Sequence, residues 1–315
     1  MKKRAWLVSI TIFLVFVLIS GCTTDGGADS DYVGREYHRG TQGIETDFVR
    51  NAPPSTVYEG DSLEVIVELR NRGAWPTSDI LEGKLEVSGF DLNAIRGTWQ
   101  GGNQMPNDLQ GRSMYNPEGG YDTMTYRDSD GVRVPFEADK YEANILVHSC
   151  YRYKTMASPI VCIDPDPYRV VQEEKVCDIE DSISVGSGQG GPVGISSIRE
   201  KVGSENIYFE IYIRNFDNGR VAHWNAYNRC PFDLEYDEIN KVIVDVKLPY
   251  DSNPDCSPAG TASDPVRLVN GQGWMHCSFN KPMSGSAFTT PLQIELRYIY
   301  SDTIEKEVEI IRITG

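Results

Sequence analysis

Hydrophobic and polar residues alternate with a period of two in several segments of the chain, most regularly at 63–70 and 207–214. Successive side chains of an extended strand point to opposite faces, so this period places the apolar side chains of a segment on one face. These apolar positions are Leu63, Val65, Val67, Leu69, Ile207, Phe209, Ile211 and Ile213. Each segment therefore predicts a strand with one buried face. Helical periodicity is scarce elsewhere, and many short strands with polar turns predict an all-β chain built as a β-sandwich.

The same landmarks occur twice along the chain and in the same order. A glycine–isoleucine pair precedes each alternating segment, an Arg-Asn followed by a glycine turn closes it, and a Tyr-x-Tyr comes later. The landmark residues are Gly43, Ile44, Asn71, Tyr151 and Tyr153 in the first copy, and Gly194, Ile195, Asn215, Tyr298 and Tyr300 in the second. Such repetition indicates an internal duplication. It predicts two tandem β-domains, at 41–172 and 173–315.

The first alternating segment also carries a family resemblance. The sequence "GDSLEVIVELRNRG", at 60–73, resembles the opening of the cell-adhesion-related immunoglobulin-like domains of bacterial and archaeal surface proteins. In those domains a strand with alternating valines runs into Asn-x-Gly. The resemblance implies that both copies are immunoglobulin-like β-sandwiches and that the chain works at a cell surface.

The N-terminus has the pattern of an export signal. Lys2, Lys3 and Arg4 precede an uncharged apolar run, which ends in small residues before Cys22. The sequence "ISGC" at 19–22 resembles the lipobox of prokaryotic lipoproteins, which implies cleavage before Cys22 and lipidation of that cysteine. We then expect a signal peptide at 1–21 and a flexible polar tether at 22–40. The alternative is an uncleaved anchor, because the apolar run is about as long as a spanning helix. Both predict an extracytoplasmic chain anchored to the cell membrane.

The charge balance limits the choice of partners. The chain has 46 acidic and 30 basic side chains and a formal net charge of −16. Such a surface repels phosphate backbones, so nucleic acid is excluded as an expected partner. The expected partners are the lipid membrane, through the N-terminal anchor, and a surface protein or glycan.

Six cysteines remain when Cys22 is set aside. An even number in an exported chain predicts disulfides, and zinc sites need close Cys-x-x-Cys pairs, which this sequence lacks. The six cysteines are Cys150, Cys162, Cys177, Cys230, Cys256 and Cys277.

The sequence also suggests how these cysteines pair. Residues 141–165 have the pattern of a hairpin with its turn at 154–158, which would place Cys150 opposite Cys162. The other four cysteines allow three pairings. We favour Cys256–Cys277 and, by elimination, Cys177–Cys230.

A glycine motif lies between the two copies. Gly186, Gly188 and Gly191 have the Gly-x-Gly-x-x-Gly spacing of dinucleotide-binding loops. That motif needs a following helix, whose N-terminus holds the pyrophosphate, and the residues after Gly191 show no helical stripe. We therefore interpret the motif as a joint and expect no nucleotide cofactor.

Two long polar segments, at 97–131 and 216–240, contain aromatic residues that are candidates for a binding site. Long segments without regular structure are often functional, although aromatic residues in them also bury against the fold. We favour burial for the first segment. The candidates are Trp99, Tyr115, Tyr121, Tyr126, Trp224 and Tyr227. An alternative function is carbohydrate binding, with Trp75, Trp99, Trp224 or Trp274 as sugar platforms.

Catalytic and metal-binding patterns are weak. Asp128, Asp130 and Gly131 match only part of a calcium loop, and "DPDP" at 164–167 has too few ligands. His148 lies near Cys150, but Cys150 is expected in a disulfide, and the chain has no nucleophile-elbow or zincin motif. We therefore expect no enzyme activity, no metal and no cofactor. The predicted function is non-catalytic binding, adhesion or scaffolding by a surface lipoprotein, and a hydrolase is the least favoured alternative.

Overall fold

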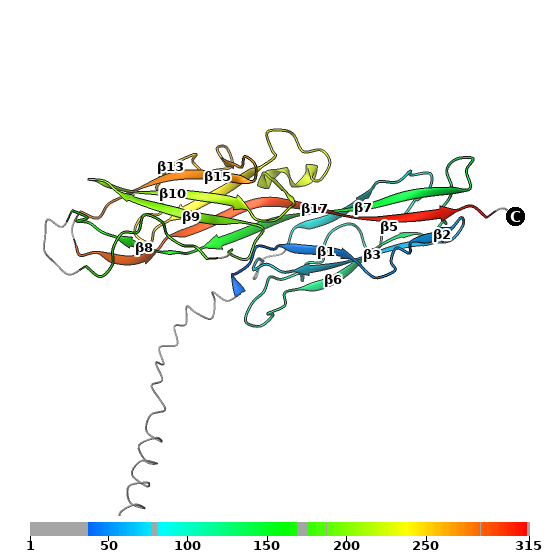
Figure 1. Ribbon diagram of the computed structural model, residues 1–315, viewed down its shortest axis with the longest axis horizontal. Helices are drawn as coiled ribbons and strands as arrows, with labels where there is room; N and C mark the ends of the chain where they lie inside the picture. Colours follow the sequence, from blue (N-terminus) through cyan, green and yellow to red (C-terminus); the bar gives the residue numbers. More distant parts are fainter. Residues whose placement is uncertain (1–36, 77–80, 169–174, 187, 284, 314–315) are drawn as a thin grey trace, which may run out of the picture. The chain divides into compact units, whose positions relative to one another are not determined.

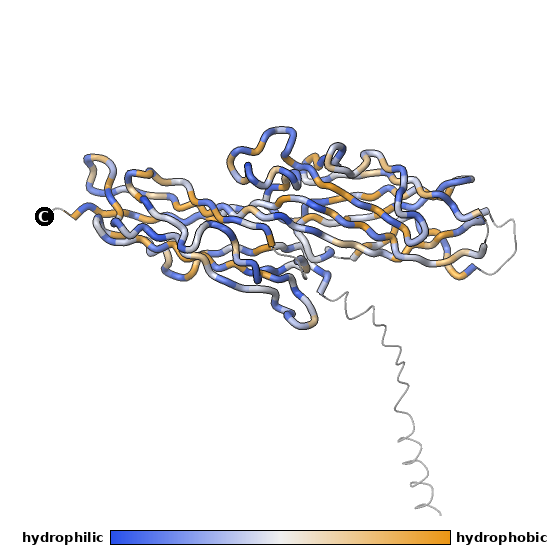
Figure 2. The backbone as a smooth tube through the Cα atoms, turned by 180° about the vertical axis from the view of Figure 1, so that it is seen from behind, coloured by the Kyte–Doolittle hydropathy of each residue, from blue (hydrophilic) through white to orange (hydrophobic). Residues whose placement is uncertain are grey.

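The computed structural model describes residues 37–76, 81–168, 175–186, 188–283 and 285–313. Their regular structure is almost entirely strands in antiparallel sheets, which confirms the predicted all-β fold. The predicted signal peptide, Cys22 and most of the predicted tether lie outside the described residues. Hydrophobic residues follow the strands, whereas turns and loops are mainly hydrophilic (Figure 2).

Two four-stranded sheets repeat one arrangement. The first has the order β1 (Ile44–Phe48), β3 (Leu63–Asn71), β6 (Tyr121–Asp128) and β5 (Thr98–Trp99). The second has the order β9 (Val193–Val202), β10 (Asn206–Asn215), β15 (Gln272–Asn280) and β13 (Asp255–Ser257). In both sheets the alternating segment found in the sequence, β3 or β10, is a central strand whose apolar residues are buried. The internal repeat is thus present in the strand order as well as in the sequence.

A third sheet is shared by the two copies. Its order is β14 (Val266–Arg267), β12 (Lys241–Lys247), β17 (Gln293–Ile311), β7 (Lys140–Ala157) and β4 (Gly83–Ser88). The short strands β2 (Thr56–Tyr58) and β11 (Arg220–Ala222) also pair with β17. Figure 1 shows β7 and β17 side by side, with β9, β10 and β15 over one end and β1, β3 and β6 against the other. A separate two-stranded sheet joins β8 (Ile160–Ile163) to β16 (Phe288–Pro291).

The two long strands pair across the predicted domain boundary. Their antiparallel register runs from Ala157 opposite Ile294 to Lys140 opposite Ile311. Residues 34–315 form one compact unit. The boundary between 172 and 173 therefore separates the copies in the sequence, while strands from both sides of it share one sheet.

The register of β7 and β17 reveals an approximate internal twofold axis. Tyr151 lies opposite Tyr300, Tyr153 opposite Tyr298, and Arg152 opposite Ile299 between them. Because Tyr151 and Tyr153 occupy the positions that Tyr298 and Tyr300 occupy in the repeat, the axis passes through this central pair. All four rings are buried, at 2% exposure or less, and neighbouring rings contact one another. We call these four residues the tyrosine cluster.

Equivalent hydrogen bonds surround the tyrosine cluster in both copies. The hydroxyl of Tyr151 accepts from the backbone N–H of Ile44 (3.0 Å), and that of Tyr298 accepts from the N–H of Val193 (3.3 Å). These bonds tie the first strand of each outer sheet to the long strands. Burial raises the pKa of Tyr151 and Tyr298 well above its usual value, so both hydroxyls stay neutral.

The asparagines that close β3 and β10 complete the pattern. The side chain of Asn71 donates to the backbone carbonyl of Trp75 (2.7 Å), and the backbone N–H of Trp75 donates to the hydroxyl of Tyr153 (3.2 Å). Asn215 donates to the carbonyl of Gly219 (2.9 Å), whose N–H donates to Tyr300 (2.8 Å). The repeated Arg-Asn and Tyr-x-Tyr landmarks are therefore parts of one hydrogen-bonded corner.

The glycine motif at 186–191 lies against this corner and leads into strand β9 rather than a helix. The carbonyl of Gly190 accepts from the N–H of Ala74 (2.7 Å) and from the hydroxyl of Tyr153 (3.3 Å). A Cβ on Gly191 would lie 2.2 Å from the Thr155 hydroxyl oxygen, so any larger residue would displace the segment. Gly190 and Gly191 therefore allow close packing between the copies.

The two long polar segments contain more regular structure than expected. Segment 97–131 includes β5 and β6, and its residues Met105 and Leu109 are buried. Segment 216–240 contains β11 and the 3₁₀ helix η1 (Trp224–Arg229). Both segments therefore combine short regular elements with stretches of turn and loop.

Two of the three expected disulfides were wrong. The structure has Cys150–Cys230, Cys162–Cys177 and Cys256–Cys277, so only the last was predicted. The expected hairpin does not form, because β7 continues to Ala157 and β8 pairs with β16. Cys162 therefore never comes opposite Cys150. Cys256 and Cys277 lie directly opposite each other on β13 and β15.

Candidate functional site

The aromatic residues selected from segment 97–131 do not gather into one surface. Tyr126 is buried, and Trp99 packs edge-on against it with ring centroids 5.6 Å apart. Tyr121 is half exposed beneath the guanidinium of Arg70, and Tyr115 is exposed elsewhere on the segment. Trp99 and Tyr126 therefore pack into the hydrophobic core, whereas Tyr115 and Tyr121 do not.

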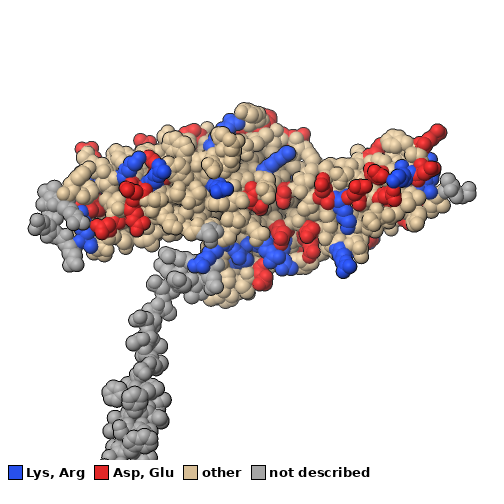
Figure 3. Space-filling view, viewed as in Figure 1, with Lys and Arg blue, Asp and Glu red and all other residues tan. Residues whose placement is uncertain are grey.

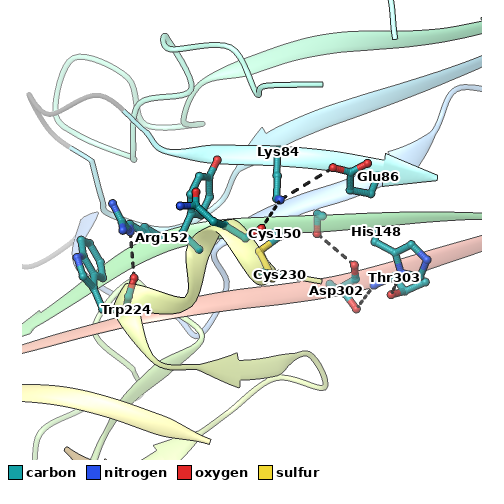
Figure 4. Close-up of a disulfide and its surroundings, with 12 residues drawn as sticks. Lys84, Glu86, His148, Cys150, Arg152, Trp224, Cys230, Asp302 and Thr303 are labelled. Atoms are coloured by element: carbon teal, nitrogen blue, oxygen red, sulfur yellow. Dashed lines mark hydrogen bonds and ion pairs between the residues drawn. A yellow bond between two sulfur atoms is a disulfide. The ribbon is translucent and has the colours of Figure 1, made fainter. Parts of the chain in front are cut away.

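Two candidate residues of segment 216–240, Trp224 and Tyr227, lie beside the guanidinium group of Arg152; Figure 4 shows Arg152 next to Trp224. The guanidinium of Arg152 lies 5.2 Å from the Trp224 ring and 5.3 Å from the Tyr227 ring. Arg152 also donates to the carbonyl of Trp224 and pairs with Glu82. The Cys150–Cys230 disulfide lies beside them and fastens η1 to the shared sheet. Trp224 and Tyr227 thus close the side of the sheet opposite the tyrosine cluster.

The polar residues considered for catalysis and calcium have structural partners. Cys150 is bonded to Cys230, and the two ring nitrogens of His148 lie 2.7 Å from the Ser88 hydroxyl and 2.8 Å from the Thr303 hydroxyl. Asp128 is buried and accepts from the N–H groups of Arg96 and Asp130. Asp164 is buried and accepts from the ammonium of Lys175. Each of these side chains therefore has a bond or hydrogen bond within the fold.

The outer face of the second four-stranded sheet carries a different group of aromatics. Tyr208 and Tyr212 point outward from β10, and Trp274 and His276 point outward from β15, because their neighbours along each strand are buried. The register places Tyr212 directly opposite Trp274. Trp274 is 57% exposed, which is unusual for so large an apolar side chain. We call these four residues the aromatic face.

Cations and ring contacts hold the aromatic face in place. The Tyr208 and His276 rings stack with centroids 5.3 Å apart. The guanidinium of Arg199, on β9, lies 5.3 Å from the Tyr212 ring and donates to its hydroxyl (3.4 Å). Lys201 pairs with Glu210 (2.7 Å), and this ion pair lowers the pKa of the Glu210 carboxyl. The Tyr208, Tyr212 and His276 rings are therefore positioned before any ligand arrives.

The internal repeat supplies a reference for this face. Counting back from the closing asparagines, Tyr208 and Tyr212 correspond to Glu64 and Glu68 on β3. The residue opposite Tyr212 is Trp274, whereas the residue opposite Glu68 is Thr123. The same sheet thus forms in the first copy with small or charged residues at these positions. The outward aromatic residues of the second copy are therefore not a requirement of this sheet arrangement.

Sequence reasoning found only part of this face. Trp274 is selected from the sequence as one of four possible sugar platforms. Tyr208 and Tyr212 occupy the positions between the apolar residues of segment 207–214 and are not selected. Aromatic residues at two outward positions of one strand were the available signal. Their juxtaposition with Trp274 required the β10–β15 register, which the sequence does not encode locally.

The second candidate feature is a pocket beside the C-terminal end of β15. A pocket of about 560 Å³ is lined by Pro249, Tyr250, Asn280, Lys281, Pro282, Phe288 and Thr290. Glu200 is buried on β9, and among the described residues neither of its carboxyl oxygens has a hydrogen-bond partner. Burial, and secondarily the charge of Asp164, raises the pKa of Glu200 to about 8. Because the walls of the pocket are mainly apolar, the aromatic face offers more groups for specific recognition.

Acidic and basic side chains are interspersed over the face of the molecule seen in Figure 3. None of the helices in the described part of the chain is long and apolar enough to cross a membrane. The chain matches no protein-family model, and no curated protein is significantly similar to it.

Proposed function

We propose that this chain is an extracytoplasmic lipoprotein, anchored through Cys22, that binds a partner at the cell surface through the aromatic face. The observation that carries the proposal is the contrast between the two copies. On the outward face of one sheet lie the partly buried Tyr208 and Tyr212 and the exposed Trp274, where the repeat has Glu64, Glu68 and Thr123. Exposed aromatics that the sheet arrangement does not require mark interaction sites, since such rings give large contact area.

The anchor and the compartment rest on the N-terminal sequence and the cysteines. A basic start, an apolar run and "ISGC" at 19–22 support export and lipidation. Three disulfides agree with an oxidising location outside the cytoplasm. We also propose that the two sandwiches are immunoglobulin-like units related by duplication, which the matching strand orders support. We propose a binding role rather than an enzymatic one, because His148 and Cys150 serve structural contacts.

The binding role is tested with proteoliposomes that carry the intact lipoprotein and are mixed with labelled cell-envelope fragments from the source cells. Trp274→Ala and Tyr212→Ala are each expected to lower envelope binding at least several-fold. The matched controls are Thr123→Ala and Glu68→Ala, at the equivalent positions of the first copy, and these are expected to bind like the wild type. Equal binding by all four variants would reject the aromatic face as the site.

The anchor is tested separately by labelling cells with a radioactive fatty acid. The wild type is expected to incorporate label and to sediment with membranes. Cys22→Ser is expected to lose the label. Retention of label by Cys22→Ser would disprove lipidation at this residue.

A further inference from the structure

The outward residues of β9, β10 and β15 form a face without aliphatic side chains. Besides the aromatic face itself, the outward positions hold polar and charged groups: Ser197, Arg199, Lys201, Asn206, Glu210, Arg214, Gln272, Ser278 and Asn280. Protein–protein interfaces usually bury an apolar core. Rings surrounded by hydrogen-bonding groups suit a ligand with small apolar patches and many hydroxyls, which describes a polysaccharide.

The charges of this face differ from those of the whole chain. Arg199, Lys201 and Arg214 face outward here, against Glu210 and Asp255, in a chain with a formal net charge of −16. Lys201 is already paired with Glu210 (2.7 Å). The guanidinium groups of Arg199 and Arg214 contact aromatic rings. Arg199 also lies opposite Glu210, and its charge helps to lower the pKa of that carboxyl. Three cations against two carboxylates leave a net positive charge on this face, which favours an anionic ligand.

We propose that the aromatic face binds an acidic polysaccharide, in which Trp274 and Tyr212 stack against sugar rings and Arg199 binds a carboxylate. This proposal rests on the proposed function and names the ligand class of the same site. Arg199 lies over the Tyr212 ring and donates to the Tyr212 hydroxyl, so a sugar stacked on the neighbouring Trp274 places its carboxylate within reach of the guanidinium. Guanidinium groups bind carboxylates through paired charge-assisted hydrogen bonds.

The length of the face favours a polymer over a single sugar. Tyr208 and Tyr212 are four residues apart on β10, which corresponds to about 13 Å at about 3.3 Å per residue. Arg214 lies beyond Tyr212 on the same strand and extends the row further. Contacts along this row need a ligand with several sugar units.

The test uses proteoliposomes carrying the intact lipoprotein and fluorescent polysaccharides. The acidic probes are polygalacturonate, alginate and hyaluronate, and the matched neutral probe is polygalacturonate with its carboxyl groups reduced to alcohols. At least one acidic probe is expected to bind. The reduced polymer and Arg199→Gln are each expected to weaken that binding about tenfold, as the loss of a charge-assisted hydrogen bond implies. Trp274→Ala is expected to abolish it, and Thr123→Ala to leave it unchanged.

The possible outcomes separate this proposal from the proposed function. Equal affinity for the reduced polymer, or no binding of any acidic probe, overturns the acidic-polysaccharide proposal. If envelope binding is still lost in Trp274→Ala, the binding role stands and a protein partner takes the place of the polysaccharide. If envelope binding also survives Trp274→Ala, both proposals fall. Thermal unfolding of each variant identifies any that fails to fold, and Tyr212→Ala then replaces it.

Discussion

Glu200 occupies an unusual position for an ionisable residue. It lies on β9 opposite Phe209 and is 2% exposed, and neither carboxyl oxygen has a hydrogen-bond partner in the described part of the chain. Its pKa of about 8 in the folded protein exceeds its ordinary value of 4.5. Between these values the folded protein binds one more proton than the unfolded chain, so the free energy of unfolding falls as pH rises. Glu200 therefore contributes its full stability below pH 4.5 and loses it as pH passes 8.

Glu200→Gln is expected to remove this part of the pH dependence. The wild type should lose up to a few kcal/mol relative to the variant between pH 5 and pH 8.5, since each pKa unit corresponds to about 1.4 kcal/mol. Urea unfolding at several pH values measures the difference, and other titrating groups cancel in the comparison. Parallel profiles for wild type and variant would show that Glu200 ionises normally in the folded protein.

Asn71 is the other buried polar residue with a testable role. Its carboxamide donates to Trp75 and Leu109 and accepts from the Gly73 N–H and the Tyr153 hydroxyl, and it is 0% exposed. Asn71→Ala removes the side-chain partner of the Trp75 and Leu109 carbonyls and of the Gly73 N–H, whereas the Tyr153 hydroxyl keeps its bonds to the Trp75 N–H and the Gly190 carbonyl. The substitution is expected to cost about 3 kcal/mol. The equivalent Asn215 is only half-buried, so Asn215→Ala should cost about 1 kcal/mol. Equal losses in denaturant unfolding would contradict this account of the corner.

Among the elements, η1 is the one that depends most on a covalent link. It packs against the shared sheet through a small cluster with Cys150, Ala226, Cys230 and Ile299 at its centre. So small a cluster buries little apolar area, and the Cys150–Cys230 bond joins segments 80 residues apart.

Replacing Cys150 and Cys230 together with alanine is expected to destabilise the protein by about 2 to 5 kcal/mol. Amide hydrogen exchange should increase at 224–230 first, because the disulfide attaches this element directly to the shared sheet and its own apolar cluster is small. Replacing Cys256 and Cys277 serves as the comparison and should leave 224–230 protected. Non-reducing peptide mapping provides the direct check, since a peptide joining Cys150 to Cys162 would contradict the structure.

At the scale of the whole molecule, the two copies depend on each other through β7 and β17. These strands pair over their full overlap, and each copy contributes one of them to the shared sheet. The tyrosine cluster buries four rings at the same place. Each copy alone would therefore expose a long unpaired strand edge.

Cutting the chain at a protease site inserted after Glu180 is expected to leave the two fragments associated. Under non-reducing conditions the Cys150–Cys230 bond holds them together. In the Cys150→Ala/Cys230→Ala variant the fragments should still co-elute in size-exclusion chromatography, because the β7–β17 pairing and the tyrosine cluster remain. Two separate folded fragments would instead support independent domains at 41–172 and 173–315.

The sequence by itself determined the strands and the repeat. The alternation of apolar and polar residues at 63–70 and 207–214 can be read directly from the sequence. It predicts a strand because a strand with one buried face needs an apolar residue at every second position. The Arg-Asn and Tyr-x-Tyr landmarks are local patterns too, although their shared hydrogen bonds became visible only in the structure.

Only the tertiary structure decided which strands are neighbours. The sequence predicts that β7 pairs with β8, but β7 pairs with β17 and β8 pairs with β16. For this reason two of the three disulfides differ from the predicted pairs, and strands of both copies lie in one sheet. The aromatic face likewise exists because the β10–β15 register puts Tyr212 opposite Trp274, 62 positions along the chain. Strand pairing is non-local, and its energy comes from contacts between segments far apart in sequence, so no local pattern specifies it.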